Sequence, residues 1–269
     1  MLAIINPSLS AKRLLKISVN ACFSIMAIGQ FIFSLYIFGL YAVSGLAGDF
    51  ERWNAAAPEG HVEGDLLGNV FFGLHVILAG IITVGGPVQL IKGIRKKFPG
   101  FHRINGRVYI GAAFLISFAG LYLVLVRGTV GGLTGRIFVI INAILIMISA
   151  FYAVSTARND QLAAHRKWAI RLFLCMSGVW FFRVFLMLWL TIHQAPVGFD
   201  PDTFQGPALS MLYVFSYILP ILFAELYFWS KRKGSREKSI LSVFLIVLSI
   251  CILVGTLSAT MGMWLPRLN

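Results

Sequence analysis

The stretch that decides the fold extends from Leu67 to Ile91 and reads LGNVFFGLHVILAGIITVGGPVQLI. It contains no Asp, Glu, Lys or Arg, and it is long enough for an α-helix, which needs about 20 predominantly apolar residues to cross the ~30 Å hydrocarbon core of a bilayer. Its apolar residues do not alternate with the period of two that a strand requires, and an open sheet cannot satisfy its edges in lipid. The stretch therefore predicts a membrane-spanning helix.

Similar apolar runs recur along the whole chain. Hydrophobic residues make up 58% of the 269 residues, charged residues only 12%, and the mean hydropathy is +0.84. A soluble domain has about 25% charged residues, so this composition excludes a soluble enzyme, a disordered chain and a disulfide scaffold. We predict an all-α polytopic bundle, a single transmembrane domain over residues 1–269, with seven spans. They are expected near 18–46, 67–91, 107–127, 135–156, 168–192, 207–230 and 239–265.

The net charge of +13 follows the expected topology. Lys and Arg cluster before the first span and in alternate connections, whereas the connection over 47–66 and the one around Asp200 and Asp202 are acidic. This alternation is the positive-inside pattern, which places the N-terminus on the cytoplasmic side and the C-terminus outside. Because the positive charge is topological, we expect the lipid bilayer as a partner and no nucleic acid.

Two features concern the helices themselves. Gly85-Gly86-Pro87 and Pro220 are expected to break the second and sixth spans, because a proline removes a helical hydrogen bond and bends the axis. Aromatic residues at the expected span ends indicate interfacial belts. These residues are Trp53, Trp189 and Trp264 on the outer side and Tyr109, Trp168 and Trp229 on the inner side.

Polar side chains at similar depth in different spans predict two internal layers. A charge at mid-helix costs roughly 2.5–3.5 kcal/mol on insertion scales, so such residues are usually inward-facing and functional. The outer layer consists of His75, Asn142, Arg183, Tyr213 and Tyr217. The inner layer consists of His102, Arg103, Arg107, His165, Arg171 and Glu225. Gln89 lies on the same face of its helix as His75, since 14 residues at about 100° each return close to the start.

Three hypotheses about neighbours follow from these depths. His102 and His165 are expected to form one inner site, and Arg183 is expected to face the bundle near His75. Glu225 is the only acid within a span and is expected to pair with Arg107 or Arg171. That pair is either a structural contact between helices or part of a proton relay. The two inner histidines either contact lipid headgroups or bind a metal or haem.

The order of these residues resembles a family of predicted bacterial membrane proteins known as domain of unknown function 2306. The resemblance covers about residues 70–230 and leaves 18–46 and 239–265 as flanking spans. It is carried by His75, Gly86-Pro87-Val88-Gln89, Arg95, Pro99, His102-Arg103, Gly106-Arg107-Val108-Tyr109, Gly120-Leu121, His165, Trp168, Arg171, Arg183, Pro220 and Ala224-Glu225. Ala169 departs from the family, whose members often have Met there. The resemblance implies a multi-pass protein of the bacterial cytoplasmic membrane and supplies no reaction.

Two functions stay open. The first is a membrane redox protein that binds haem b or quinone through His75, His102, His165, Arg107, Arg171 and Arg183. The second is a transporter, channel or sensor for a small anion or for protons, in which Gln89, Asn142, Tyr217 and Glu225 are further intramembrane polar residues. A retinal protein is excluded because the last span has no Lys, and no spacing typical of a hydrolase is present.

Overall fold

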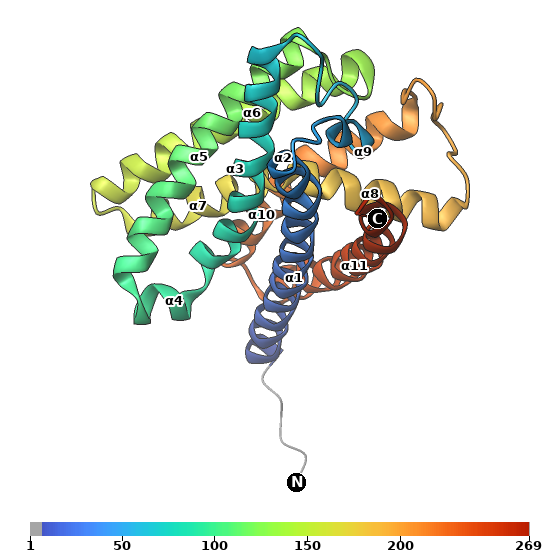
Figure 1. The fold of residues 1–269 in the computed structure, drawn as a ribbon. Helices are drawn as coiled ribbons and strands as arrows, with labels where there is room; N and C mark the ends of the chain where they lie inside the picture. The colour runs from blue at the N-terminus through green and yellow to red at the C-terminus, as the bar shows by residue number, and fades with distance from the viewer. Residues whose placement is uncertain (1–6, 269) are drawn as a thin grey trace.

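The computed structural model describes residues 7–268, which form α-helices joined by short connections (Figure 1). The first half contains α1 (Pro7–Ile37), a π-helical turn (Phe38–Ala42), α2 (Val43–Leu46), a 3₁₀ turn (Glu51–Ala55), α3 (Leu66–Leu90), α4 (Lys92–Lys97), α5 (Pro99–Val126) and α6 (Gly132–Arg158). The second half contains α7 (Leu162–Met176), α8 (Gly178–His193), α9 (Pro207–Tyr217), α10 (Leu219–Ser230), α11 (Ser235–Ala259), a π-helical turn (Thr260–Trp264) and a 3₁₀ turn (Leu265–Arg267). Within residues 7–268 the only β-pairing is an isolated bridge between Asp200 and Gln205.

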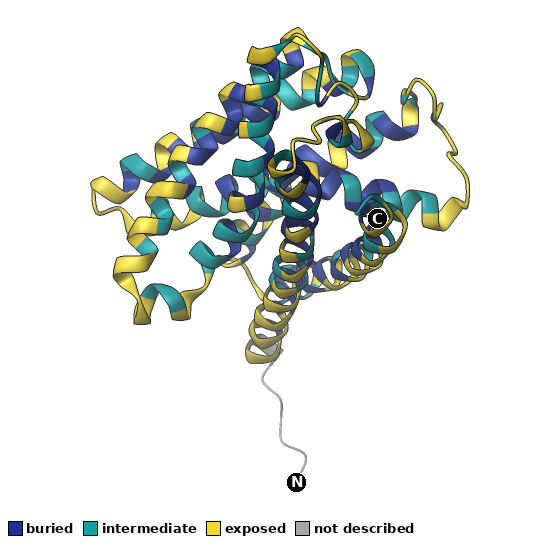
Figure 2. Cartoon of the chain, viewed as in Figure 1, coloured by how far each residue is buried: buried dark blue, intermediate teal, exposed yellow. Residues whose placement is uncertain are grey.

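The predicted fold class is confirmed. Within the described residues, six helical segments are long and apolar enough to cross a membrane, and the α7–α8 pair makes a seventh if it is counted as one span. Many of their large apolar side chains are exposed, and Figure 2 shows exposed residues along the outer faces of α1, α5 and α6. A water-soluble protein rarely exposes so much contiguous apolar surface, whereas lipid accommodates it.

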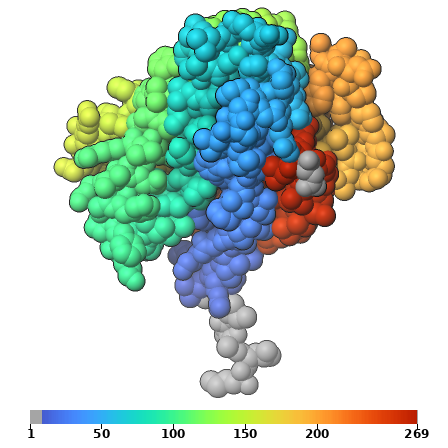
Figure 3. Space-filling view, viewed as in Figure 1, coloured from blue at the N-terminus to red at the C-terminus, as the bar shows by residue number. Residues whose placement is uncertain are grey.

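Helices that follow one another in the chain pack side by side, and α11 closes the bundle. α3 packs between α1 and α5, α6 between α5 and α7, and α8 against both α9 and α11. α11 returns along α1, so the first and last spans are neighbours. In the space-filling view α1 lies at the surface along its length, with α3 on one side and the C-terminal turns on the other (Figure 3). We call the end with connections 91–98, 159–161 and 231–234 the basic side, and the end with 47–65, 127–131 and 194–206 the acidic side.

One helix break lies where the sequence predicts it, and one does not. The sixth span is interrupted at Ile218, two residues before Pro220, and α10 begins at Leu219. The fifth span is interrupted at Ser177, and the axes of α7 and α8 differ by 51°. Ser-Gly pairs are common kink sites, and Ser177-Gly178 is such a pair. Ser177 Oγ donates to Phe173 O at 2.7 Å and accepts from Gln30 Nε2 at 2.7 Å, so the bend is held by a side chain of α1.

The prediction of a break at Gly85-Gly86-Pro87 is wrong. α3 continues through these residues to Leu90, and Pro87 stands only three residues before its end. The glycines serve packing instead. A Cβ atom on Gly86 would lie 3.0 Å from both the Tyr109 hydroxyl and a ring carbon of Phe173, so a larger residue would have to displace these rings of α5 and α7.

Candidate functional site

Two cavities occupy the interior of the bundle. The basic-side cavity, of about 1360 Å³, is lined by residues of α1, α3, α5, α6, α7, α8, α10 and α11 and reaches the basic connections. The acidic-side cavity, of about 500 Å³, reaches the connections over residues 56–59 and 127–130. One face of α3 serves both, because His75 lines the acidic-side cavity and Gln89 lines the basic-side cavity.

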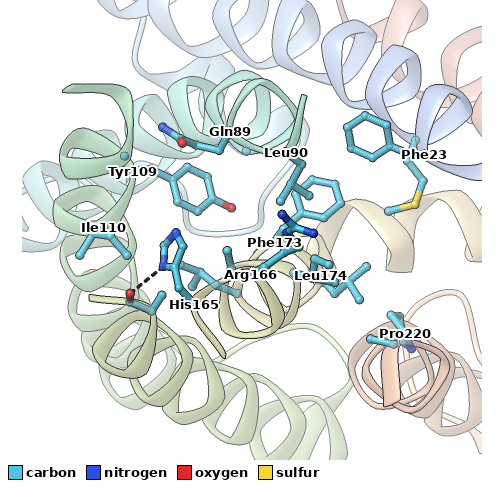
Figure 4. A pocket seen from close by; sticks show the side chains of 18 of the residues that line it. Phe23, Gln89, Leu90, Tyr109, Ile110, His165, Arg166, Phe173, Leu174 and Pro220 are labelled. Atoms are coloured by element: carbon cyan, nitrogen blue, oxygen red, sulfur yellow. Dashed lines mark hydrogen bonds between the residues drawn. The ribbon is translucent and has the colours of Figure 1, made fainter. Parts of the chain in front are cut away.

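The basic-side cavity contains a histidine with one ring nitrogen already engaged. His165 Nδ1 lies 2.8 Å from the carbonyl oxygen of Ala153 on α6, and Figure 4 shows this contact with the ring beside Tyr109. A carbonyl only accepts, so Nδ1 carries the hydrogen and Nε2 of the neutral ring keeps its lone pair. A backbone carbonyl fixes metal-ligating histidines in proteins in this way.

His102 lines the same cavity from the start of α5. Gln89 Nε2 donates to the carbonyl oxygen of His102 at 2.9 Å, and Asn105 Nδ2 donates to Gly85 O at 3.1 Å, so α3 fixes this turn of α5. Nδ1 of His102 is buried and has no hydrogen-bond partner among the described residues. The structure therefore brings His102 and His165 to one cavity, as expected.

The walls of the basic-side cavity differ in character. Where α1, α8, α10 and α11 face it, the lining is mostly apolar and includes Phe23, Phe181 and Leu248. The side near α3, α5 and α7 carries cations, and no Asp or Glu belongs to the lining within the part of the chain that the structure describes. The cationic residues are Lys92, Arg95, Arg103, Arg107, Arg158 and Arg166.

The acidic-side cavity holds the expected outer layer. His75, Asn142, Arg183, Tyr213 and Tyr217 all line it. His75 Nδ1 lies 3.2 Å from Ile116 O, which leaves Nε2 as an acceptor, and Gly120 provides the space for the ring because a Cβ there would lie 3.1 Å from it.

Arg183 is the cation of this cavity. Its Cζ lies 5.5 Å from the ring centroid of Phe33 on α1, so the guanidinium faces the bundle, as predicted. No ion pair joins it to any carboxylate of the described residues. Arg183 is half-buried, and the cation–π contact with Phe33 offsets part of the cost of taking the guanidinium out of water.

Four polar side chains of the acidic-side cavity have an atom without a partner. These atoms are the hydroxyl of Tyr36, Oγ of Ser117, Oδ1 of Asn142 and Nε1 of Trp180, and none of them has a hydrogen bond within residues 7–268. The four residues are between 2% and 7% exposed. Buried polar atoms in proteins are nearly always satisfied, so an unpartnered set around one cavity indicates a place for water or a ligand.

Tyr109 and Phe173 line both cavities and form the partition between them. The expectation that Tyr109 lies at the membrane interface is wrong, since this residue is 7% exposed and packs against Gly86 inside the bundle. Trp53 and Trp264 are likewise buried at 6% and 1%. Glycines of α3 leave room for two of these rings, because a Cβ on Gly73 would lie 3.0 Å from Trp53 and one on Gly86 would lie 3.1 Å from a ring carbon of Tyr109. The ring of Trp264 packs against Phe33 and Tyr36 of α1.

Arg171 and Glu225 form the expected ion pair but belong to neither cavity. Arg171 Nε lies 2.6 Å from Glu225 Oε1, and the guanidinium Cζ lies 4.3 Å from the ring of Trp168. Glu225 is exposed on the outer face of α10. The inner layer therefore contains His102, Arg103, Arg107 and His165, whereas this pair joins α7 to α10 on the outside of the bundle.

An ion pair that the sequence analysis missed closes the acidic side. Arg127, at the end of α5, contacts Asp65 Oδ2 at 2.7 Å and Asn69 Oδ1 at 2.7 Å, and it donates to the carbonyl of Glu59 at 2.7 Å. Asp65 also caps α3 by accepting from Gly68 N at 2.9 Å. These hydrogen bonds from Arg127 and Gly68 hold the pKa of Asp65 below its usual range. The sequence feature that could have indicated this ion pair is Arg127 itself, a single Arg at the end of a predicted span that faces the acidic connections.

The missed members of the acidic-side cavity are mostly neutral. Gln30, Tyr36, Ser117 and Ser177 carry no charge, and only Gln30, an amide within a charge-free span, gave a signal in the sequence. Within the described part of the chain, no group of three or more His, Cys, Asp or Glu could hold a metal ion by itself.

Comparison with known proteins gives one match. A family model described as "Predicted membrane protein (DUF2306)" matches residues 72–228, more than half of the chain. No curated protein and no solved structure matches. The matched region begins within α3 and ends within α10, so it includes the histidines and arginines of both cavities and leaves α1 and α11 as flanks.

Proposed function

The chain belongs to the DUF2306 family of predicted membrane proteins, and we propose that it is a redox protein of the bacterial cytoplasmic membrane that holds haem b in its basic-side cavity. The observation that carries the proposal is the engaged Nδ1 of His165, which leaves Nε2 as a ligand at the wall of a large cavity. Haem iron in proteins is commonly held by such a histidine.

The walls of the cavity suit an amphipathic anion. Haem b has an apolar macrocycle and two carboxylates, and the basic-side cavity combines an apolar wall with six cationic side chains and no acid among its described lining residues. Arg107 is the most informative of them, because it lies within α5 beyond the basic connection. Quinone is neutral and gives these cations no partner, so the lining favours haem over quinone.

The residues have distinct roles in this proposal. His165 would hold the haem iron through Nε2, and His102 on α5 would supply a second imidazole. Arg103 and Arg107 bind the propionates, and Tyr109 with Phe173 separates the macrocycle from the acidic-side cavity. When bound, haem supplies one-electron transfer, and the buried aromatic partition excludes water from it.

The test is the reduced-minus-oxidised visible spectrum of protein purified in detergent after expression with adequate haem. We expect a sharp α-band and near-stoichiometric iron. His165→Asn, which keeps a donor for the Ala153 carbonyl, should remove the band, whereas His75→Asn in the other cavity should keep it. A flat spectrum of the folded wild-type protein contradicts the proposal.

A second candidate function is solute transport. It is favoured by the helix breaks at Ser177 and Ile218, because discontinuous helices near the bundle centre are typical of transporter binding sites. The two cavities then form successive parts of one path, with Tyr109 and Phe173 as its closure. Flux of a solute into proteoliposomes without haem would favour this function.

A further inference from the structure

We propose that the acidic-side cavity binds a small organic anion that has one carboxylate and an apolar body of about the size of an aromatic ring. This site is separate from the one proposed for haem, because the two cavities share only Tyr109 and Phe173 among their described lining residues.

The first argument is charge. Arg183 has no carboxylate partner among the described residues, and it lies in a helix that is expected to cross the membrane. The other cation of this cavity, Arg127, is already engaged by Asp65. The one carboxylate in the described lining, Glu59, is exposed in the connection at the mouth of the cavity. One unpaired positive charge calls for one negative charge, so the ligand is a monoanion.

The second argument is hydrogen bonding. Tyr36 and Ser117 offer unpartnered hydroxyls that donate to a carboxylate, and Arg183 offers the planar fork of a guanidinium, which matches the two carboxylate oxygens. Asn142 presents Oδ1 without a partner because its Nδ2 is engaged by Cys175 O at 3.2 Å. Such an acceptor suits a hydroxyl or an N–H group on the body of the ligand.

The third argument is size and lining. A cavity of about 500 Å³ is far larger than a halide needs, and rings supply much of its wall. Phe182, Tyr213 and Tyr217 form a stacked series, with ring centroids 4.5 Å apart for the first pair and 5.9 Å for the second. Apolar and aromatic walls with a few placed polar groups are typical of sites for small organic molecules.

The fourth argument is partial enclosure. Arg127 ties residues 59 and 65 together on the acidic side, and Tyr109 and Phe173 lie between the cavity and the basic side. The mouth beside the exposed Glu59 stays open to an entering anion, and the apolar surroundings of Arg183 make its attraction for that anion stronger than in bulk water.

Isothermal titration calorimetry with benzoate tests the proposal on the intact protein in detergent, with empty micelles as the blank. We expect benzoate to bind at one site, and benzamide, which is neutral but similar in shape, to bind about tenfold more weakly or worse. Arg183→Gln should lower the benzoate affinity by about tenfold or more, and Arg183→Lys should lower it less because the charge remains.

Matched variants keep the result interpretable. Arg107→Gln is the same change in the basic-side cavity and should leave benzoate binding unaltered. If Arg183→Gln does not fold, Tyr36→Phe and Ser117→Ala replace it as test variants. Each keeps the packing, and each should weaken benzoate binding a few-fold. The proposal is overturned if folded wild-type protein binds no benzoate, if benzamide binds equally well, if Arg183→Gln and Arg107→Gln act alike, or if inorganic phosphate binds more tightly than benzoate.

Discussion

The two cavities lie end to end in one bundle, yet their walls differ in kind. The basic-side cavity has six cations, two histidines and an apolar wall, and the unpartnered atom of its described lining side chains is Nδ1 of His102. The acidic-side cavity has a single cation without a carboxylate partner among the described residues, Arg183, and several unpartnered polar atoms within a wall of aliphatic and aromatic side chains. Positively charged connections surround the basic-side cavity. On the acidic side, hydrogen bonds from Arg127 join the end of α5 to the connection before α3.

The two proposed sites rest on this difference in charge. Cations near the basic connections need no ligand to explain them, because the positive-inside rule already places Lys and Arg on that side of the membrane. A lone Arg within the bundle has no such explanation, and this is why we propose an anionic ligand for Arg183. The predictions below test the difference, from the largest expected effect to the smallest.

The largest effect is expected where the fold has no room. A Cβ on Gly178 would lie 2.5 Å from the ring of Tyr217, whereas a Cβ on Gly111 meets nothing within 4 Å. Gly178→Val should therefore strongly reduce the yield of folded protein, because overpacking forces helices apart, while Gly111→Ala should be neutral or slightly stabilising. Size-exclusion chromatography of both variants measures this, and equal yields would contradict the packing described at the α7–α8 bend.

The second effect compares the two interhelical ion pairs. The Arg127 side chain is 7% exposed and that of Arg171 is 20% exposed, and their carboxylate partners are 32% and 46% exposed. Arg127→Gln should lower the melting temperature by several degrees, and Arg171→Gln by about two degrees or less, because exposed pairs contribute little. Thermal unfolding in detergent checks the order, and the reverse order would show that the acidic side is not held by Arg127.

The third effect is a pH dependence at the acidic side. The pKa of Asp65 is lowered in the folded protein, so its contribution to stability is present above the unfolded pKa of about 3.9 and is lost as the pH falls through the folded value. Between about pH 5 and about pH 3, the melting temperature of the wild-type protein should fall more than that of Asp65→Asn. Asn at position 65 can still accept the hydrogen bond from Gly68 N. Identical pH profiles of the two proteins would therefore mean that the Asp65–Arg127 ion pair adds no stability.

The smallest effect concerns an unpartnered hydroxyl. Ser117 is 3% exposed and its Oγ has no partner among the described residues, so Ser117→Ala removes no hydrogen bond within that part of the chain. Without ligand, the melting temperature should stay the same or rise slightly. Ser149 is a matched site whose hydroxyl is not among those unpartnered atoms, so Ser149→Ala should lower the melting temperature more.

The sequence predicts the spans well because their signals are local. Charge-free runs end at residues such as Asp65 and Lys92, and the structure begins and ends α3 next to both. The depth of a residue in the membrane follows from its distance along the span. The residues of the outer layer were predicted at similar depth, and they line one cavity.

Rotation about a helix axis cannot be predicted in the same way. Arg171 lies outside both cavities and is partly exposed, whereas its neighbour Leu172 is 2% exposed and lines one of them. Glu225 is exposed, whereas its neighbour Ala224 lines the same cavity. One residue turns a helix by about 100°, so depth alone does not say which face a residue occupies. That choice depends on neighbouring helices, and so does the bend at Ser177, which Gln30 of α1 stabilises.

The central claim is that the two cavities are two separate sites, and one paired measurement tests it most directly. His165→Asn and Arg183→Gln proteins are each examined for the haem α-band and for benzoate binding under the same conditions. We predict that the first variant loses the band and keeps benzoate binding, and that the second loses benzoate binding and keeps the band. If either variant loses both properties while it remains folded, or if neither variant loses anything, the two cavities do not act as separate sites.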